Sequence, residues 1–368
     1  MSPQPLRRRI GQLLLGSFTG SDVPVEIRSL AREFDLGGIT LFGRLGNIET
    51  PEQVAGLAFD VRNLGGEAPA WVGIDQEGGR VARLRSPFTE WPPMAALGRS
   101  DDSSLAGKFA AALASELKAV GVTLDFAPVL DIHTNPNNPV IGDRALGDTP
   151  DVVAKLGRVI IDELQRAGVA ACGKHFPGHG DTAADSHVEL PIVEHPPDRL
   201  RAVEFVPFKA ALDAGVAFIM TAHVLVTAID DERPATLSPK VVTAILRDEL
   251  GFNGVIVSDD LEMKAIAGRY TPGEAAVAAI AAGCDALLMC GKGQTVDIEL
   301  QGQALEALVH AIEDGTLPVT QVESALARNR AAKERFLREW RPPTPAQLRS
   351  IIGAEAHRAI SEQMAEFA

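Results

Sequence analysis

The residues between Lys174 and His187 form the densest group of chemically active side chains in this sequence. The segment reads KHFPGHGDTAADSH and contains one lysine, three histidines and two aspartates. Its proline and two glycines prevent a single continuous helix. Because the short apolar run Val169–Cys172 comes directly before it, we expect a polar loop that begins where a buried strand ends.

Asp185 and His187 stand two residues apart within this segment. In an extended loop, the carboxylate of Asp185 accepts a hydrogen bond from the ring N–H of His187. Such a bond orients the imidazole and raises its basicity, which suits a general acid or base. The glycines and alanines around the pair predict a mobile loop that brings His187 to a bound substrate and then withdraws.

The same histidines allow a second interpretation, a metal site. His175, His179 and His187, together with Asp181 and Asp185, offer enough ligands for zinc or iron. His175 and His179 have the spacing of a metalloprotease helix, but a proline and a glycine interrupt that helix and no glutamate follows His175. From the residues alone, acid–base chemistry is favoured and metal binding stays open.

Short apolar or β-branched runs alternate with longer amphipathic segments along most of the chain. The predicted strands are Leu13–Phe18, Gly38–Phe42, Ala70–Asp75, Thr123–Val129, Val169–Lys174, Ala217–Thr221, Gly254–Ser258 and Ala286–Met289. The predicted helices are Pro24–Glu33, Pro51–Asn63, Ser103–Val120, Pro150–Ala167, Pro197–Ala214, Pro239–Leu250, Pro272–Ala282 and Glu299–Asp314. Several of these helices open with proline and end at glycine, as helix boundaries often do.

Strands that alternate with helices indicate parallel βαβ units, and eight such units are typical of a (β/α)8 TIM barrel. A doubly wound open sheet is the alternative, although no glycine-rich phosphate-binding motif follows the first strand. Further helices are predicted at 319–340 and 344–366. We therefore expect one barrel domain over 1–340 and a helical extension over 341–368 that packs on the barrel.

In a TIM barrel the chemistry lies at the carboxyl ends of the strands. Polar residues follow five predicted strands there: Asp75 after the third, Asp131 after the fourth, Lys174 and His175 at the fifth, His223 at the sixth, and Asp259 with Asp260 at the seventh. We interpret Asp259 as facing the pocket and Asp260 as capping or supporting the next turn. Lys174 and His175 suit hydrogen bonds to ligand hydroxyl groups. Asp75 and Arg83 also allow the simpler interpretation of a mutual ion pair.

The other histidines, and the composition, narrow the possible partners. His133, His195, His310 and His357 have no convergent partner in the sequence and are expected to be structural or exposed. The net charge of −14 argues against nucleic acid or an anionic membrane surface as the main partner. No apolar run approaches the ~20 residues of a membrane span.

The cysteines and the N-terminus indicate a cytoplasmic location. The three cysteines, Cys172, Cys284 and Cys290, lack zinc-site spacing and are expected to be buried thiols of a reducing compartment. The basic and apolar start of the chain lacks the length and cleavage site of a signal peptide. We expect a cytoplasmic monomer.

Taken together, these motifs resemble glycoside hydrolase family 3, in particular its single-domain bacterial β-N-acetylglucosaminidase (β-hexosaminidase) branch. The similar segments are Gly73–Val81, Asp125–Asp131, Ile141–Arg144, Lys174–His187 and Ser258–Met263. Of these, Lys174–Gly180 followed by Asp185-Ser186-His187 is the most specific. The strand count extends the similarity to most of the chain.

The resemblance implies a retaining exo-β-N-acetylglucosaminidase. Asp259 then resembles the nucleophile and His187 the general acid/base, with Asp185 as its partner. The residues that resemble the sugar-binding set are Asp75, Arg83, Arg144, Lys174 and His175. No metal or organic cofactor is implied, and the expected substrate is a small carbohydrate or muropeptide from peptidoglycan turnover.

Two rival functions fit the same fold. A metal-dependent TIM-barrel hydrolase would use the histidine-rich loop as ligands. A non-catalytic barrel would bind the sugar without turnover.

Overall fold

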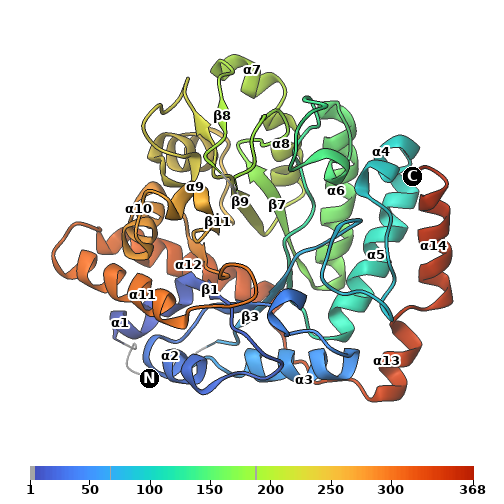
Figure 1. Cartoon of the computed structure of the whole chain (residues 1–368), viewed down its shortest axis with the longest axis horizontal. Coiled ribbons are helices and arrows are strands. Elements are labelled where there is room, and N and C mark those ends of the chain that lie inside the picture. The colour runs from blue at the N-terminus through green and yellow to red at the C-terminus, as the bar shows by residue number, and fades with distance from the viewer. Residues whose placement is uncertain (1–4, 67, 187–188) are drawn as a thin grey trace.

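Eight parallel strands close into a barrel in the computed structural model, which describes residues 5–66, 68–186 and 189–368 (Figure 1). The barrel strands are β1 (Leu14–Gly16), β2 (Gly38–Thr40), β3 (Trp71–Ile74), β6 (Leu124–Asp125), β7 (Ala170–Phe176), β9 (Phe218–Thr221), β11 (Val255–Asp260) and β12 (Ala286–Leu288). Each overlaps a predicted strand. Their order around the barrel follows the chain, so the TIM-barrel prediction is confirmed and the open-sheet alternative is wrong.

Two small sheets lie outside the barrel. The antiparallel hairpin of β4 (Gln76–Gly78) and β5 (Val81–Ala82) follows β3, and β8 (Ile192–Val193) pairs with β10 (Leu225–Val226). Sequence analysis missed both sheets, because their strands are only two or three residues long.

Helices surround the barrel. Those that match predicted helices are α2 (Val25–Phe34), α3 (Pro51–Arg62), α5 (Ser103–Ala119), α6 (Pro150–Ala167), α10 (Pro272–Ala282), α11 (Ile298–Glu313) and α12 (Val319–Phe336). Further helical turns are α1 (Leu6–Arg9), η1 (Ile10–Leu13), η2 (Gly43–Leu45), α4 (Met94–Ser100), η3 (Gly142–Arg144), η4 (Ala235–Leu237) and α9 (Lys264–Ala267).

Three predicted helices differ in detail. The segment 197–214 divides into α7 (Pro197–Ala202) and α8 (Phe205–Asp213), because Val203 leaves helical geometry with φ −128° and ψ −72°. The segment 344–366 divides into α13 (Pro345–Ile351) and α14 (Glu355–Ala365) at Gly353, whose φ is +60°. The segment η5 (Lys240–Glu249) is a π-helix.

Apolar side chains fill the barrel interior. One buried cluster gathers inward-facing residues from the barrel strands, and Phe336 of α12 joins it. Trp71 contacts Phe218 edge to face at 5.2 Å between ring centroids and lies 6.4 Å from Phe336. The three cysteines are buried and unpaired, as predicted. These layers form a solid floor below the carboxyl ends of the strands.

The last two helices lie against the outer face of the barrel. Figure 1 shows α13 and α14, in red, beside α5 and α4. Within the described residues, no helix is long and apolar enough to cross a membrane.

Candidate active site

A cavity of 670 Å³ opens at the carboxyl ends of the strands, where the fold predicts a site. Seven of the eight residues predicted from the sequence line it: Asp75, Arg83, Arg144, Lys174, His175, Asp185 and Asp259. The eighth, His187, lies outside the described residues.

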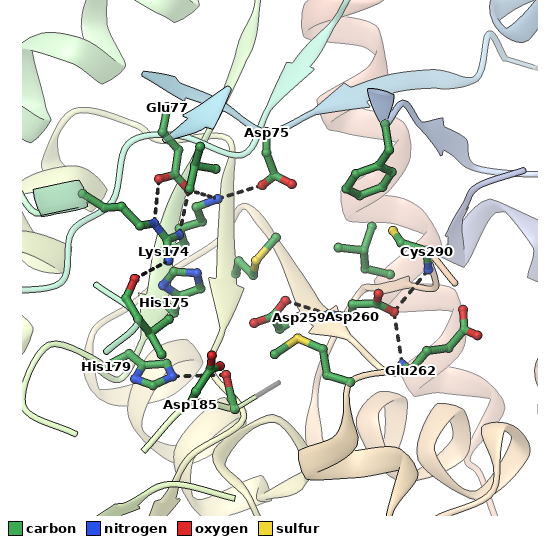
Figure 2. A pocket seen from close by; sticks show the side chains of 18 of the residues that line it. Asp75, Glu77, Lys174, His175, His179, Asp185, Asp259, Asp260, Glu262 and Cys290 are labelled. Atoms are coloured by element: carbon green, nitrogen blue, oxygen red, sulfur yellow. Dashed lines mark hydrogen bonds and ion pairs between the residues drawn. The ribbon is translucent and has the colours of Figure 1, made fainter. Parts of the chain in front are cut away.

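Lys174 lies at the centre of an ion-pair network in this cavity (Figure 2). Its side chain is only 2% exposed, and Nζ lies 2.9 Å from Oδ1 of Asp75 and 2.6 Å from Oε1 of Glu77. Burial alone would lower the pKa of Lys174, but the two carboxylates raise it above its ordinary value. The lysine therefore stays charged in a buried position.

Two arginines complete the network from opposite sides. Arg144 donates two parallel hydrogen bonds to Glu77, at 2.9 and 2.8 Å, and Arg83 donates one to Asp75 at 2.9 Å. Burial opposes ionisation, yet Arg144 and Lys174 lower the pKa of Glu77 to about 2. Lys174 and Arg83 likewise hold the pKa of Asp75 well below its ordinary value, against the effect of burial. Asp75 and Arg83 are thus paired, but within a larger network.

His175 is fixed by a carboxylate behind it. Nδ1 of His175 lies 2.7 Å from Oδ2 of Asp131, which also accepts the backbone N–H of His179 through Oδ1 at 2.6 Å. Burial raises the pKa of Asp131, but the nearby His175 and His179 together lower it more, so the pKa of Asp131 lies below its ordinary value. With Nδ1 engaged, the Nε2 edge of His175 is the one left to face a ligand.

The loop after β7 is tied down at its base. Asn138 donates from Nδ2 to the carbonyl oxygens of His179 and Thr182, at 2.8 and 3.0 Å. Asp181 accepts from Thr134 at 2.8 Å and pairs with His195. Through these bonds His179 and Asp181 help to shape the loop, and His195, which was expected to be structural or exposed, has a structural contact. Mobility was predicted around Asp185 and His187, and these bonds hold the preceding residues 178–182 in place.

His179 is a neutral, buried residue rather than an exposed ligand. Its ring bonds to Oγ of Thr182 at 2.6 Å and to Oγ of Ser186 at 3.2 Å. Burial lowers its pKa to about 4. Within residues 5–66, 68–186 and 189–368, no group of three or more histidine, cysteine, aspartate or glutamate side chains could hold a metal ion.

Asp259 and Asp260 end β11 on the side of the cavity opposite Lys174, as Figure 2 shows. The carboxylate of Asp260 accepts the backbone N–H groups of Glu262 and Cys290, at 3.1 and 3.2 Å, so it caps the following turn as predicted. Burial and the nearby Glu262 raise the pKa of Asp260 to about 8. Asp259 also lines the cavity, and its Oδ1 accepts the N–H of Asp260 at 2.7 Å.

Sequence analysis missed several residues of this site. Glu77 was not predicted as a site residue, although it lies two residues after Asp75 and therefore near the end of the same strand. Two guanidinium groups lie over the ring of Phe42, with Cζ of Arg44 at 4.6 Å and Cζ of Arg83 at 5.2 Å from its centroid. Arg44 also donates to the carbonyl oxygens of Cys290 and Gly293 on the far wall. Nothing in the local spacing indicated these contacts between distant segments.

Residues 5–330 match the family profile of the glycosyl hydrolase family 3 N-terminal domain. The chain belongs to glycosyl hydrolase family 3. It is therefore a glycoside hydrolase, as the sequence motifs implied.

Curated family 3 relatives carry the name β-hexosaminidase. The protein of Pseudoalteromonas piscicida, β-hexosaminidase A, is 34% identical over 93% of this chain. This chain spans only 60% of that relative's length. The protein of Tolumonas auensis is 39% identical over 87% of this chain and 91% of its own length.

Solved family 3 structures have the same fold. The β-N-acetylglucosaminidase of Paenibacillus sp. FPU-7 superposes with a TM-score of 0.92 at 39% identity, covering 99% of this chain and 69% of its own. NagZ of Neisseria gonorrhoeae, solved with N-trifluoroacetyl-D-glucosamine, gives a TM-score of 0.78 at 29% identity over 97% and 98% of the two chains.

Proposed function

We propose that this glycoside hydrolase is a retaining exo-β-N-acetylglucosaminidase. The observation that carries the proposal is the placement of Asp259 across one cavity from the network of Asp75, Lys174 and Arg83. One wall is suited to hold a polar sugar ring, and the other offers a carboxylate to its anomeric carbon. The names of the relatives support N-acetylglucosamine as that sugar.

The network leaves groups available for sugar hydroxyls. Nζ of Lys174 has three N–H donors, and two carboxylates engage two of them. Each oxygen of Asp75 accepts one hydrogen bond within the network and has capacity for another. The network consists of three cations and two carboxylates, so each buried charge keeps an opposite charge beside it when these groups bind a ligand.

In the proposed mechanism Asp259 attacks the anomeric carbon and the glycosidic C–O bond breaks, which gives a covalent glycosyl-enzyme. His187 donates its proton to the leaving oxygen. The neutral imidazole then takes a proton from water, whose oxygen attacks the anomeric carbon and releases Asp259. Asp185, which lines the cavity, is proposed to orient His187.

The proposed source of the sugar is a muropeptide or disaccharide of peptidoglycan turnover, processed in the cytoplasm. This assignment rests on the resemblance of Lys174–His187 to the single-domain branch.

A chromogenic aryl β-N-acetylglucosaminide tests the proposal. We expect turnover by the wild-type chain and a loss of at least about 10³-fold in kcat for Asp259→Ala, because no other group would form the glycosyl-enzyme. Asp162→Ala, on the exposed face of α6, is the matched control and should keep full activity. Near-normal turnover by Asp259→Ala would remove Asp259 from the nucleophile role.

Two other outcomes would identify the rivals. Binding of N-acetylglucosamine without turnover would indicate a non-catalytic sugar-binding barrel. Turnover that is lost on chelation and restored by zinc would indicate a metal-dependent hydrolase.

A further inference from the structure

Helices α13 and α14 lie within residues 341–368, beyond the 5–330 region that matches the family profile. They bury apolar side chains against the barrel, with Leu348, Ile352 and Met364 each no more than 8% exposed. Several of their polar contacts lead, directly or through Glu116 of α5, to residues 83–93, which we name the 83–93 loop. This loop connects the β4–β5 hairpin to α4.

Glu116 of α5 joins the C-terminal helices to the 83–93 loop. Its side chain is 3% exposed and takes part in four hydrogen bonds. From the loop, Thr89 donates its backbone N–H at 3.0 Å and its hydroxyl at 2.6 Å. From the C-terminal segment, Gly353 donates its backbone N–H at 2.9 Å, and Nδ1 of His357 lies 2.9 Å away. One buried carboxylate thus ties three segments together.

Two direct contacts supplement this link. Ser361 of α14 donates its hydroxyl to the carbonyl oxygen of Glu90 at 2.6 Å. Gly353 packs so closely on the loop that a Cβ there would come within 2.3 Å of the carbonyl oxygen of Pro87. A larger residue at this position would force the helices and the loop apart.

The far end of the 83–93 loop supports the β4–β5 hairpin. The backbone N–H of Gly79 donates to the carbonyl oxygen of Trp91 at 2.9 Å. A Cβ on Gly79 would come within 2.8 Å of Pro93, so no space separates the two backbones. Gly79 lies two residues from Glu77, which binds Lys174 and Arg144 in the cavity.

The near end of the loop holds Arg83. The amide oxygen of Gln76 accepts the backbone N–H groups of Arg83 and Leu84 at 2.7 and 2.9 Å, while its Nε2 donates to the carbonyl oxygen of Leu84 at 3.0 Å. Arg83 in turn pairs with Asp75. Both ends of the loop therefore lead to charged groups that line the cavity.

We propose that α13 and α14 position the sugar-binding wall of the active site, and that Glu116 is the positioning residue that transmits their contact. Through the 83–93 loop, they hold Glu77 and Arg83 in the places where these residues engage Lys174 and Asp75. The inference rests on the proposed function, because it assigns sugar binding to that wall.

The double variant His357→Ala/Ser361→Ala tests this inference without altering a cavity residue. It removes one bond to Glu116 and the bond to Glu90, so the 83–93 loop gains freedom. We expect KM for an aryl β-N-acetylglucosaminide to rise about three- to tenfold with kcat changed less than about twofold, since sugar binding weakens while the reacting groups stay in place. The matched control is His310→Ala/Ser324→Ala, which removes an exposed histidine and an exposed serine on α11 and α12.

Hydrogen exchange provides a readout that does not depend on activity. Amides of residues 76–93, including that of Gly79, should exchange faster in the double variant than in the control. Glu116→Gln, which keeps the size of the side chain but places an amide N–H₂ among N–H donors, should show the same KM rise and the same exchange pattern. A lower melting temperature with unchanged KM and unchanged exchange over 76–93 would reduce the C-terminal helices to a stabilising role and overturn the inference.

The inference and the proposed function fail in different ways. If the wild-type chain does not turn over the substrate, the proposed function fails, and faster exchange over 76–93 still supports the mechanical link. If the wild type is active and neither KM nor exchange responds, only the inference fails.

Discussion

Lys174 keeps its charge inside the barrel because two carboxylates lie close to its nitrogen, at 2.9 and 2.6 Å. Leaving either the lysine or a carboxylate there alone would cost several kcal/mol, roughly 3–5. Lys174 and Asp75 were predictable as site residues, because the predicted barrel places both at the carboxyl ends of strands. The third member, Glu77, was not predicted: its spacing of two from Asp75 places it at the same strand end, but only the fold shows that its side chain points toward Lys174.

The proposed acid/base role of His187 makes a prediction about leaving groups. His187→Ala should reduce turnover strongly for a natural disaccharide and much less for an aryl glycoside with a very acidic phenol, since such a leaving group needs little protonation. Comparing kcat/KM across a series of phenols measures this difference. Equal losses on both kinds of substrate would mean that His187 only positions the sugar.

The buried His179 predicts a pH dependence of stability. Burial lowers its pKa from the ordinary histidine value of 6.5 to about 4, so the unfolded chain binds more protons between these two values. The free energy of unfolding should therefore fall as pH falls from 6.5 to about 4, by up to ~3 kcal/mol from this residue.

Denaturant titrations at about pH 4.5, 5.5, 6.5 and 7.5 span this range and measure the slope. His179→Gln should flatten it, whereas His310→Gln, an exposed histidine on α11, should leave it unchanged. A slope that is the same in all three proteins would contradict the burial of a neutral His179.

At the scale of elements, every barrel strand was predictable, because each is a short apolar run bounded by turn residues. The helix breaks were not. At Val203 the backbone leaves helical geometry, although the sequence has no proline or glycine at that position. At Gly353 the chain packs closely on Pro87, a contact that forms only in the folded protein.

The base of the loop after β7 gives a prediction at this scale. A Cβ on Gly180 would come within 1.8 Å of the carbonyl oxygen of Ile132, so Gly180→Ala must displace the loop. We expect a loss of about 1–3 kcal/mol in stability and a clear fall in kcat/KM with the barrel still folded. Gly56→Ala in α3, where a Cβ meets nothing within 4 Å, should instead raise stability by up to about 1 kcal/mol. Chemical denaturation and the aryl substrate measure both, and an unperturbed Gly180→Ala would show that the loop base does not need this close contact.

At the scale of the whole molecule, the closed barrel brings separate strand ends, those of β3, β7 and β11 among them, to one cavity. This convergence is why Asp75 and Asp259, far apart in the chain, were predictable as members of one site once eight strands had been counted. The same topology did not predict the role of α13 and α14, because their contacts with the 83–93 loop do not belong to the repeating unit. The expected monomer and the domain boundary at residue 340 stay predictions.

The packed interior of the barrel also determines the route by which a ligand enters and leaves the cavity. Trp71, Phe218 and Phe336 fill the interior below the cavity, so no passage leads through the described part of the barrel. A ligand must therefore enter and leave the cavity on the side of the carboxyl ends of the strands. Under the proposed function, the aglycone and the released monosaccharide therefore leave through the same opening at the carboxyl ends of the strands.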